Sequence, residues 1–498
     1  MHWVDATVKN QQGPQIVSTG ISPSGPIHLG NLREIITGDL LFRGCRDKGL
    51  ESELIYLADD MDPLRKKYPF LSDEYEAHVG KPLRHIPSPD GNGLYSDYFL
   101  NPFIKSASEL GIFPRIIKAG DLYRDGKMGE VIRIAIQNGD KIRTLIETIS
   151  GRELEKEWFP YNPICSSCGR INSTTGYELN GDLVSYKCKC GHEGKSNIFK
   201  EEGKLPWRIE WPAKWKVLGV TIEPFGKDHG TVGGSYDTGK AIAENIYGYP
   251  APLPLMFERI LLKGKGAMHS STGNVIPASE ILSFCPPEIV RFLMSRVPST
   301  RHIEFDPGMG FLSLMDEYQR IVKDHKPEDS RIIELSSPFG SDEREVIDYR
   351  HIATLVQIYD DPTKILKIIK STGVETSLED ISKIMTLAKH WIVNYAPETF
   401  KFSILPKTQV VKITDEEKIV VSDFIHWAQL PDSQWEATSI HNAIHIIIKE
   451  HGIEPANGFR IFYSILIGKE RGPRLGFFLS AMDKKTLLER FKFVVSSS

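Results

Sequence analysis

No apolar stretch in the sequence reaches the ~18 consecutive residues that a membrane-spanning helix needs. The first residues, from Met1 to Asp5, lack the basic region and the apolar stretch of an export signal. A strong excess of one charge is also missing: the net charge of -4 argues against a protein that coats nucleic acid unselectively. We therefore expect a cytoplasmic protein without a membrane partner, in which any RNA contact is confined to a local basic surface.

Cysteine is scarce, and most of it is clustered. Of six cysteines, four lie within 26 residues and have the spacing Cys-x2-Cys, nineteen residues, Cys-x-Cys: Cys165, Cys168, Cys188 and Cys190. In a reducing compartment such a cluster indicates a metal site rather than disulfides, and the spacing is close to that of a zinc ribbon. We expect these residues to bind a structural Zn²⁺, with His192 as an alternative to Cys190. The isolated Cys45 and Cys285 are predicted to be buried packing residues.

Repeats and low-complexity tracts are absent, but 498 residues exceed the roughly 250 to 300 that one core can hold. Residues 15–21 read as a buried strand, residues 32–46 as a helix, and residues 53–60 as a second strand that ends in two acids. A strand, helix, strand unit favours a parallel sheet with a right-handed crossover. The sequence therefore predicts an α/β fold for the first part of the chain.

Further along the chain, composition changes twice. Residues 165–204 are rich in Gly, Ser, Asn, Lys and Cys, which is typical of a metal-stabilised insertion, and the α/β pattern returns with the apolar stretch 255–262. After about residue 312 the patterns become helical, and Thr414 with Glu417 predicts a capping box. We expect a first sheet segment, a zinc-binding insertion, a second sheet segment and an all-α region, at residues 1–160, 161–204, 205–311 and 312–498.

The turn between the first strand and its helix carries the sequence Pro23-Ser24-Gly25-Pro26-Ile27-His28-Leu29-Gly30-Asn31. At such a turn, backbone N–H groups and the helix dipole face an anion, here a triphosphate. His28 adds a donor that can stabilise charge on the α-phosphate during displacement. The alternative is a tight turn with a structural histidine.

A second loop of glycines, hydroxyls and basic groups occupies residues 264–274 and has the composition of a phosphate clamp. By itself it is also compatible with an ordinary surface turn. Its combination with His28 favours a nucleotide site made of two segments that are far apart in the sequence.

These two segments resemble the signatures of the class I aminoacyl-tRNA synthetases. His28-Leu29-Gly30-Asn31 is similar to His-Ile-Gly-His, and Ala267-Met268-His269-Ser270-Ser271 is similar to Lys-Met-Ser-Lys-Ser. Within that class, five stretches, the first of which contains the first signature, resemble the lysine-specific family, so that the resemblance covers nearly the whole chain: residues 19–31, 59–66, 204–212, 226–229 and 472–476.

The resemblance implies activation of lysine by ATP, with Mg²⁺, to lysyl-adenylate, followed by transfer to tRNA(Lys), which this family binds before activation. It implies a monomer with a Rossmann-type catalytic domain and a helical domain that reads the anticodon. Trp391, Trp427, Trp435 and Arg474 are candidates for anticodon contacts, with core packing as the alternative.

The same resemblance assigns roles to individual residues. Catalytic roles fall to His28, Asn31, Lys265, His269, Ser270 and Ser271. ATP binding falls to Pro23, Ser24, Gly25, His28, Gly30, Gly226, Asp228 and Met268. Lysine binding falls to Thr19, Gly20, Asp59, Asp60, Trp207 and His229, because an ammonium group requires an acidic or aromatic pocket. The alternatives are core packing for Trp207 and Trp211, and turn capping for Asp59 and Asp60; Phe257 is interpreted as core.

The second signature departs from the family pattern. Ala267 replaces a lysine that ordinarily neutralises the triphosphate, and His269 replaces a serine. Lys263 or Lys265 could supply the missing charge. Three alternative functions stay open: a glutamate-specific synthetase, which predicts basic residues in place of Asp59 and Asp60; an RNA-binding paralogue with weakened activity; and a small-molecule nucleotidyltransferase, which leaves the helical half unexplained.

Overall fold

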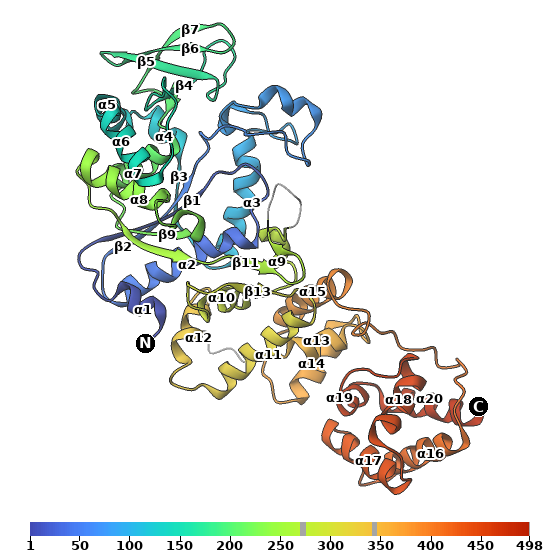
Figure 1. Cartoon of the computed structure of the whole chain (residues 1–498). Coiled ribbons are helices and arrows are strands. Elements are labelled where there is room, and N and C mark those ends of the chain that lie inside the picture. The colour runs from blue at the N-terminus through green and yellow to red at the C-terminus, as the bar shows by residue number, and fades with distance from the viewer. Residues whose placement is uncertain (269–274, 341–345, 498) are drawn as a thin grey trace. The chain divides into compact units, whose positions relative to one another are not determined.

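A five-stranded parallel sheet lies at the centre of the first part of the chain (Figure 1). The computed structural model describes residues 1–268, 275–340 and 346–497. Two compact units are formed, one by Met1–Phe305 with His325–Asp342 and the other by Asp306–Asp324 with Glu343–Ser498. No helix among the described residues is long and apolar enough to cross a membrane.

The strand order of the central sheet is β10-β9-β1-β2-β3, and every neighbouring pair is parallel: β1 (Gln15–Ile21), β2 (Ser52–Ala58), β3 (Arg115–Lys118), β9 (Ile222–Gly226) and β10 (Leu253–Phe257). β1 and β2 pair in continuous register from Gln15 opposite Ser52 to Ile21 opposite Ala58. This confirms the parallel α/β fold predicted from the sequence. Strand order reverses between β1 and β9, which is the switch point where ligands bind in such sheets.

Helices cover the sheet and complete the first unit. They are α1 (Trp3–Val8), α2 (Leu29–Asp47), α3 (Tyr95–Glu109), α4 (Ala119–Arg124), α5 (Gly129–Gln137), α6 (Gly139–Ser150), α7 (Trp207–Leu218), α8 (Ser235–Ile242), α9 (Ala278–Leu282), α10 (Pro287–Ser295) and α12 (Ser330–Ser336). Short 3-10 turns span Asp73–His78, Leu83–His85 and Lys227–His229, and a π turn spans Ala243–Tyr247.

A fully buried arginine ties several of these helices together. Arg291 on α10 donates to Asp39 Oδ2 of α2 at 2.7 Å and to the backbone oxygens of Leu110 and Leu335 at 3.2 and 3.0 Å. A buried guanidinium requires such partners because its desolvation is costly. Cys45 and Cys285 are buried as predicted, with exposed fractions of 0% and 1%.

A small second sheet lies beside the first and has the order β12-β11-β13: β11 (Ile260–Leu262), β12 (Gly266–Ala267) and β13 (Ile303–Phe305). The apolar stretch 255–262 is therefore divided between two sheets, because β10 ends at Phe257 and β11 begins at Ile260. Phe257 is buried, as expected for a core residue. β11 and β12 form an antiparallel hairpin that carries Lys263 and Lys265.

The cysteine-rich segment folds as a separate antiparallel meander of β5 (Thr174–Asn180), β6 (Leu183–Cys188) and β7 (Glu193–Asn197), seen at the top of Figure 1. Its two ends pair with each other through β4 (Asn162–Pro163) and β8 (Gly203–Lys204). The chain therefore leaves the first unit's parallel-sheet domain and returns to it at adjacent points, as expected for an insertion.

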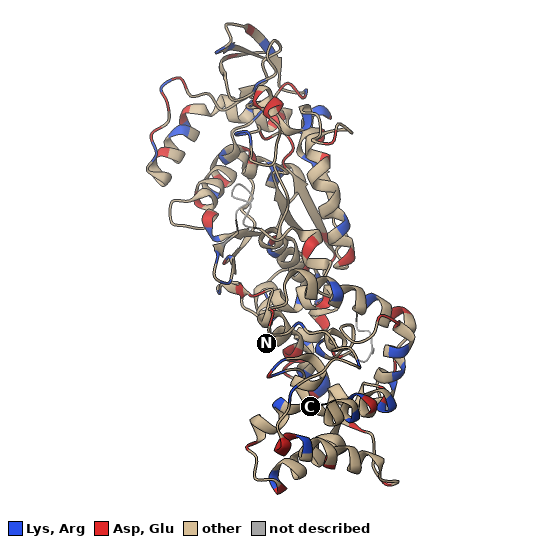
Figure 2. Cartoon of the chain, turned by 90° about the vertical axis from the view of Figure 1, so that its right-hand side faces the viewer, with Lys and Arg blue, Asp and Glu red and all other residues tan. Residues whose placement is uncertain are grey.

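The second unit contains only helices among its described residues: α11 (Met309–Asp324), α13 (Tyr349–Leu355), α14 (Pro362–Ser371), α15 (Leu378–Asn394), α16 (Asp415–Gln429), α17 (Ala437–Glu450), α18 (Pro455–Ile467), α19 (Leu475–Ser480) and α20 (Lys484–Ser497). The predicted capping box is confirmed, because the Thr414 hydroxyl accepts from Glu417 N and the Glu417 carboxylate accepts from Thr414 N. Trp391 is fully buried and donates to Pro307 O at 2.7 Å, which is core packing. Basic and acidic residues are interspersed along the helices (Figure 2), in keeping with the balanced composition.

Candidate active site

The candidate site lies where β1 and β9 end, at the switch point of the sheet. β1 ends at Ile21 and is followed by the Pro23 to Asn31 segment, and β9 ends at Gly226 and is followed by Asp228 and His229. In parallel sheets the crevice outside the carboxyl ends of the strands at this point is the usual ligand site. The fold therefore brings the segment predicted to bind the nucleotide and the segment predicted to bind the ribose to the same end of the sheet, where the strands have their carboxyl ends.

His28 and Asn31 form a capping box at the start of α2. His28 Nδ1 accepts from Gly30 N at 3.1 Å, and Asn31 Oδ1 accepts from His28 N at 3.1 Å. This arrangement fixes the imidazole tautomer at Nδ1 and leaves Nε2 as the ring nitrogen that the cap does not use. Gly30 is required for the close approach, since a Cβ there would lie 2.9 Å from His28 Cε1.

The chain that follows the second signature lies beside the first signature. Leu29 N donates to Ile276 O at 2.9 Å, and Ala278 N donates to Ile27 O at 2.9 Å, so the chain that follows the second loop runs antiparallel to the first signature. Met268 Cε would be 3.7 Å from a Cβ at Gly30. His269, Ser270 and Ser271 lie outside the described residues, whereas Lys265 is exposed on the β11–β12 hairpin.

Asp228 is exposed at the end of β9 and forms an ion pair with Arg259. The backbone oxygen of Arg259 accepts from the buried Arg33 of α2 at 3.3 Å, and Arg33 also donates to Ser299 O and Arg301 O at 3.2 and 2.8 Å. Helix α2, which begins with the first signature, thus anchors the loops around Asp228, the carboxylate that is predicted to bind the ribose.

An aromatic cluster lies beside these strand ends. Trp207 stacks on Trp211 with ring centroids 5.2 Å apart, and His229 lies 5.1 Å from Trp207 and 5.7 Å from Trp211. Burial lowers the pKa of His229, so its ring is neutral at neutral pH. Trp207 and His229, both predicted from the sequence, are therefore brought together, and Trp211 joins them.

The acids that follow β2 already have cationic partners. Asp59 forms an ion pair with Lys214, and Asp60 accepts from Arg84 Nη1 at 3.1 Å and from Gly120 N at 2.8 Å. Burial raises the pKa of both, to about 6 for Asp60, and these partners oppose the rise. Asp60 is almost fully buried and faces Arg84. Asp59 instead lies near two other acids, Glu210 and Asp62.

Two acids that the sequence analysis did not identify complete this region. Glu34 Oε1 accepts from Gly20 N at 2.8 Å, and Glu223 Oε1 accepts from Trp211 Nε1 at 3.0 Å. Glu223 Oε2 has no hydrogen-bond partner among the described residues. Burial raises the pKa of each carboxyl to about 8, and the negative charge of Asp59 adds to the effect.

The sequence positions of both acids could have indicated a functional role. Glu34 is in the first turns of the predicted helix, directly after the first signature, and Glu223 interrupts an apolar strand. A charged residue within an apolar strand, as at Glu223, is uncommon without a partner.

A network of buried charges supports the end of β2. Lys204 Nζ lies 2.5 Å from Asp62 Oδ1 and 2.7 Å from Glu210 Oε2, and Lys214 lies 3.3 Å from Glu210 Oε1 while pairing with Asp59. Glu210 also accepts from Tyr123 Oη at 2.6 Å. Lys204, Lys214 and Glu210 are at most 4% exposed, so each charge depends on the others.

The other predicted residues lie at the end of β1, with different exposure. Pro23 is buried, and Ser24 and Gly25 are partly exposed in the turn, where Ser24 O accepts from Tyr95 Oη at 2.7 Å. Thr19 has no exposed surface, and its hydroxyl lies 3.4 Å from Ile55 O. Thr19 is therefore buried, whereas Gly20 N contacts the Glu34 carboxyl.

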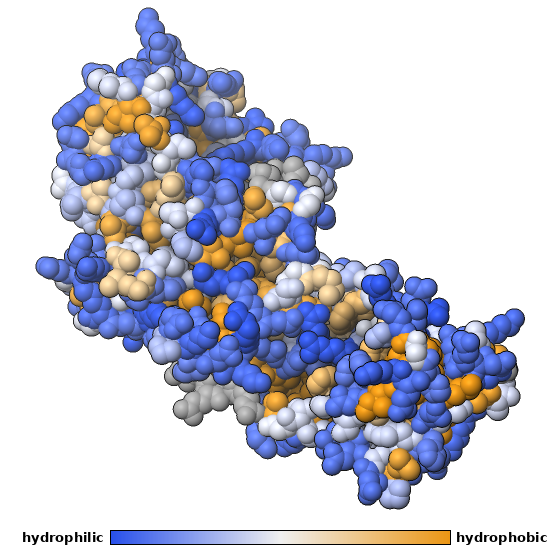
Figure 3. All heavy atoms as spheres, turned by 60° about the horizontal axis from the view of Figure 1, so that its bottom comes forward, coloured by the Kyte–Doolittle hydropathy of each residue, from blue (hydrophilic) through white to orange (hydrophobic). Residues whose placement is uncertain are grey.

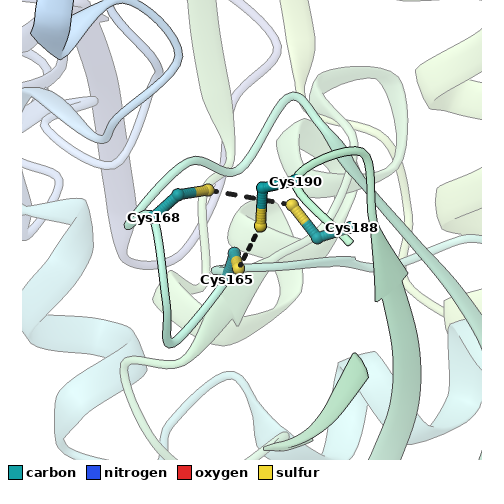
Figure 4. Close-up of side chains that lie close together, drawn as sticks. All are labelled: Cys165, Cys168, Cys188 and Cys190. Carbon is teal, nitrogen blue, oxygen red and sulfur yellow. Dashed lines mark hydrogen bonds between the residues drawn. The ribbon is translucent and has the colours of Figure 1, made fainter. Parts of the chain in front are cut away.

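The four clustered cysteines point toward one another (Figure 4), and their sulfur atoms all lie within 4.8 Å of one another. Cys165 Sγ is 3.7 Å from Cys190 Sγ, and Cys168 Sγ is 3.7 Å from Cys188 Sγ. Four thiolates at Zn–S distances of about 2.3 Å in a tetrahedron would be about 3.8 Å apart. The site therefore fits Zn²⁺ with four cysteines. His192 Nε2 instead bonds Ser166 Oγ at 2.8 Å.

Comparison with known proteins gives matches over the whole chain. Residues 1–338 match the family described as "tRNA synthetases class I (K)". Over 503 residues the chain is 48% identical to the lysine–tRNA ligase of Thermoplasma acidophilum, covering 99% of each, and it is 41% identical to that of Archaeoglobus fulgidus, again covering 99% of each. A solved glutamate tRNA ligase from Elizabethkingia meningosepticum is 13% identical, with a TM-score of 0.44 and coverage of 98% of this chain and all of that one.

Substituting Cys188→Ser should remove the metal and unfold the meander while sparing the parallel sheet, because Zn²⁺ supplies the folding energy of such small modules. Elemental analysis should find a single Zn²⁺ per chain in the wild type and almost none in the variant, with far-UV circular dichroism largely retained. Cys45→Ala, outside the cluster, is the matched control and should keep its zinc. A wild-type protein that is folded and free of zinc would contradict the assignment.

Proposed function

The chain belongs to the class I (K) tRNA synthetase family, and on this premise we propose that it joins lysine to its tRNA through a lysyl-adenylate intermediate. The observation that carries the proposal is the meeting of three features near the carboxyl ends of β1 and β9: the first signature paired with the chain that follows the second loop, an aromatic cluster and a group of buried acids. A nucleotide site next to a pocket for a cation is what the activation of lysine requires.

In the first step a lysine carboxylate oxygen bonds to the α-phosphorus of ATP, the bond to the bridging oxygen of the β-phosphate breaks, and pyrophosphate leaves with that electron pair. The α2 N-terminus contributes backbone N–H groups and the positive end of its dipole to the phosphates. His28, held by the Gly30 cap, places Nε2 to stabilise negative charge on the α-phosphate. Gly226 and Asp228 are proposed to hold the ribose.

In the second step a hydroxyl of the terminal tRNA ribose attacks the carbonyl carbon of the adenylate, the bond from that carbon to the phosphate oxygen breaks, and AMP leaves with the hydroxyl proton. The tRNA is proposed to be tRNA(Lys). We further propose a cytoplasmic monomer that uses ATP with Mg²⁺. Zn²⁺, when bound by the four cysteines, holds the insertion folded and takes no part in either step.

Lysine recognition is proposed to use the aromatic cluster and the acids beside it. Trp207, Trp211 and His229 offer ring faces to the aliphatic chain, and an ammonium over such rings is attracted by their quadrupoles. Glu34 and Glu223 offer carboxyl groups to the ammonium. A glutamate side chain would bring another carboxylate toward Asp59, whose negative charge repels it, and would find no cationic group at Glu34 or Glu223. This disfavours the glutamate-specific alternative.

The function is tested by pyrophosphate exchange with purified protein, using lysine, glutamate and arginine, each with and without tRNA(Lys). We expect exchange with lysine only, and only when tRNA is present. Glutamate-dependent exchange would favour the alternative specificity. The absence of a lysine-dependent signal under either condition would refute the proposal.

Lysine binding should release protons. Because Glu34 and Glu223 have pKa values of about 8, both are largely protonated in the free protein at pH 7, and an adjacent ammonium favours the carboxylate. The KM for lysine, measured with saturating ATP and tRNA, should therefore fall as pH rises from 6 to 8, by up to about tenfold per pH unit for each proton released. It should level off above pH 8.

Glu34→Gln and Glu223→Gln test which acid responds, because glutamine keeps the shape and cannot lose a proton. The substitution of the acid that binds the ammonium should raise the KM for lysine and flatten the pH dependence of that KM. Glu109→Gln on the exposed face of α3 is the control and should leave both unchanged. A KM that rises with pH in the wild type would contradict this recognition mode.

Lys265 is proposed to supply the positive charge that Ala267 does not. Lys265→Ala should lower kcat for pyrophosphate exchange by about tenfold or more, with little change in the KM for lysine, because the charge acts mainly in the transition state. Lys9→Ala, an exposed lysine of the same unit, should have no effect. Restoring the signature with Ala267→Lys should change the rate little. A large gain would instead identify a catalytically weakened enzyme.

A further inference from the structure

Exposed apolar side chains form patches among hydrophilic ones on the face that Figure 3 presents, and few exposed side chains of either kind react with mild oxidants. A cysteine thiolate does react. Of the six cysteines, all of which the structure describes, only Cys190 is exposed, and Cys168 is partly buried. Burial raises the pKa of the Cys45 thiol to about 11 and that of Cys285 well above its usual range, which keeps both in the unreactive thiol form. Cys190 is therefore the cysteine that a dissolved oxidant meets first.

Cys190 lies in the turn between β6 and β7. This turn is closed at its base by Cys188 N, which donates to His192 O, and by Gly191 N, which donates to Cys188 O, both at 2.9 Å. Gly191 has a φ of +91°, a conformation that favours glycine. The pairing of β6 with β7 ends before this turn. Cys190 can therefore shift without breaking the ladder between the two strands.

Cys165 is the partner within reach of Cys190. Its Sγ is 3.7 Å from Cys190 Sγ, and the two side chains come from separate loops (Figure 4). Cys165 is 1% exposed, and its backbone N donates to Arg170 O at 3.0 Å, so its own loop holds it in place. The two sulfur atoms must approach by roughly 1.7 Å to reach the length of an S–S bond. A small movement of the exposed turn supplies this approach.

We propose that Cys190 is an oxidation site, at which hydrogen peroxide converts the metal centre into a disulfide. A cysteine that binds Zn²⁺ is a thiolate. The Cys190 thiolate attacks one oxygen of the peroxide, the O–O bond breaks, and a sulfenic acid and a hydroxide ion are formed. The Cys165 thiolate then attacks the sulfenic sulfur, the S–O bond breaks, and a second hydroxide ion leaves as the disulfide forms. Two thiolates are oxidised and one peroxide is reduced, so the reaction needs no other reagent.

The disulfide leaves too few ligands for the metal. Cys168 and Cys188 are the remaining thiolates of the cluster, and His192 Nε2 is already bonded to Ser166 Oγ at 2.8 Å. Since a structural Zn²⁺ site has four protein ligands, the metal is released. Cys168 Sγ and Cys188 Sγ are 3.7 Å apart and can form a second disulfide by the same two steps.

The loop that carries Cys165 also contacts a segment that leads to the candidate active site. Ile171 N donates to Gly80 O at 2.8 Å. Further along this segment, Arg84 N donates to Asp60 O at 2.9 Å, and the Arg84 guanidinium pairs with the Asp60 carboxylate. Loss of the metal loosens this loop, so we expect lysine ligation to decline as zinc is released. That consequence rests on the proposed function, whereas the oxidation itself does not.

Treatment of the zinc-loaded, full-length protein with hydrogen peroxide tests the proposal. A zinc indicator dye should show release of the metal, and mass spectrometry of unreduced peptides should find Cys190 linked to Cys165 in the first disulfide. Cys45 and Cys285 should remain free thiols. Reduction with dithiothreitol, followed by Zn²⁺, should restore the metal content. Zinc that stays bound through the treatment, or a first disulfide that lacks Cys190, would overturn the proposal.

Cys190→His separates metal binding from oxidation, because histidine binds Zn²⁺ but forms no sulfenic acid. Its zinc release in peroxide should be slower than that of the wild type by at least about tenfold. Cys45→Ala, outside the cluster, is the matched control and should release zinc at the wild-type rate. Equally fast release from Cys190→His would count against the proposal. If this variant binds no zinc, the disulfide mapping of the wild type decides.

An assay of lysine ligation on the same samples separates this inference from the proposed function. Ligation by the treated wild type should fall in parallel with zinc release and should recover after reduction and addition of Zn²⁺. Ligation that persists after complete zinc release would overturn the link to Asp60. Absence of ligation by the untreated protein would instead overturn the proposed function, and the disulfide mapping would still decide on the oxidation site.

Discussion

Burial of ionisable groups at the carboxyl ends of β1, β2 and β9 is the constraint on which the rest of the structure depends. Lys204 and Lys214 are almost without solvent contact, and removing either would leave acids such as Glu210 and Asp59 buried without a counter-charge. Breaking such a pair is strongly destabilising, whereas the intact network mainly fixes geometry. Because Lys204 belongs to β8, at the base of the insertion, the same network joins the zinc-binding segment to α7 and to the end of β2.

The acids in this region are of two kinds, those with a cationic partner in the protein and those without one. Asp59, Asp60 and Asp62 have lysine or arginine partners inside the protein. Glu34 and Glu223 accept hydrogen bonds from Gly20 and Trp211 and have no lysine or arginine partner among the described residues, so burial holds them in the neutral form near neutral pH. A cation that enters beside the Trp207 and Trp211 rings therefore meets acids that no internal cation has neutralised. This difference is the physical basis for the proposed choice of lysine.

Local features were predictable from the sequence, and distant pairings were not. Residues 15–21, the helix after Asn31 and the Thr414 cap follow from periodicity and capping rules that act within a few residues. The cysteine cluster follows from its spacing, although only the structure favours Cys190 over His192. By contrast, Lys214 is 155 residues from Asp59 and Lys204 is 142 residues from Asp62. Sequence reasoning therefore identified Asp59 as an acid for the substrate but could not show that the protein supplies its partner. It also missed Glu223, whose role depends on Trp211 from another element.

The central claim is that Glu34 or Glu223, rather than Asp60, receives the substrate ammonium within the aromatic cluster. The most direct test is a crystal structure with a non-hydrolysable lysyl-adenylate analogue and tRNA. The account predicts the ammonium nitrogen at about 3 Å from a carboxylate oxygen of Glu34 or Glu223, with the aliphatic chain against Trp207 and Trp211. An ammonium bound at Asp60, or one outside the aromatic cluster, would contradict it.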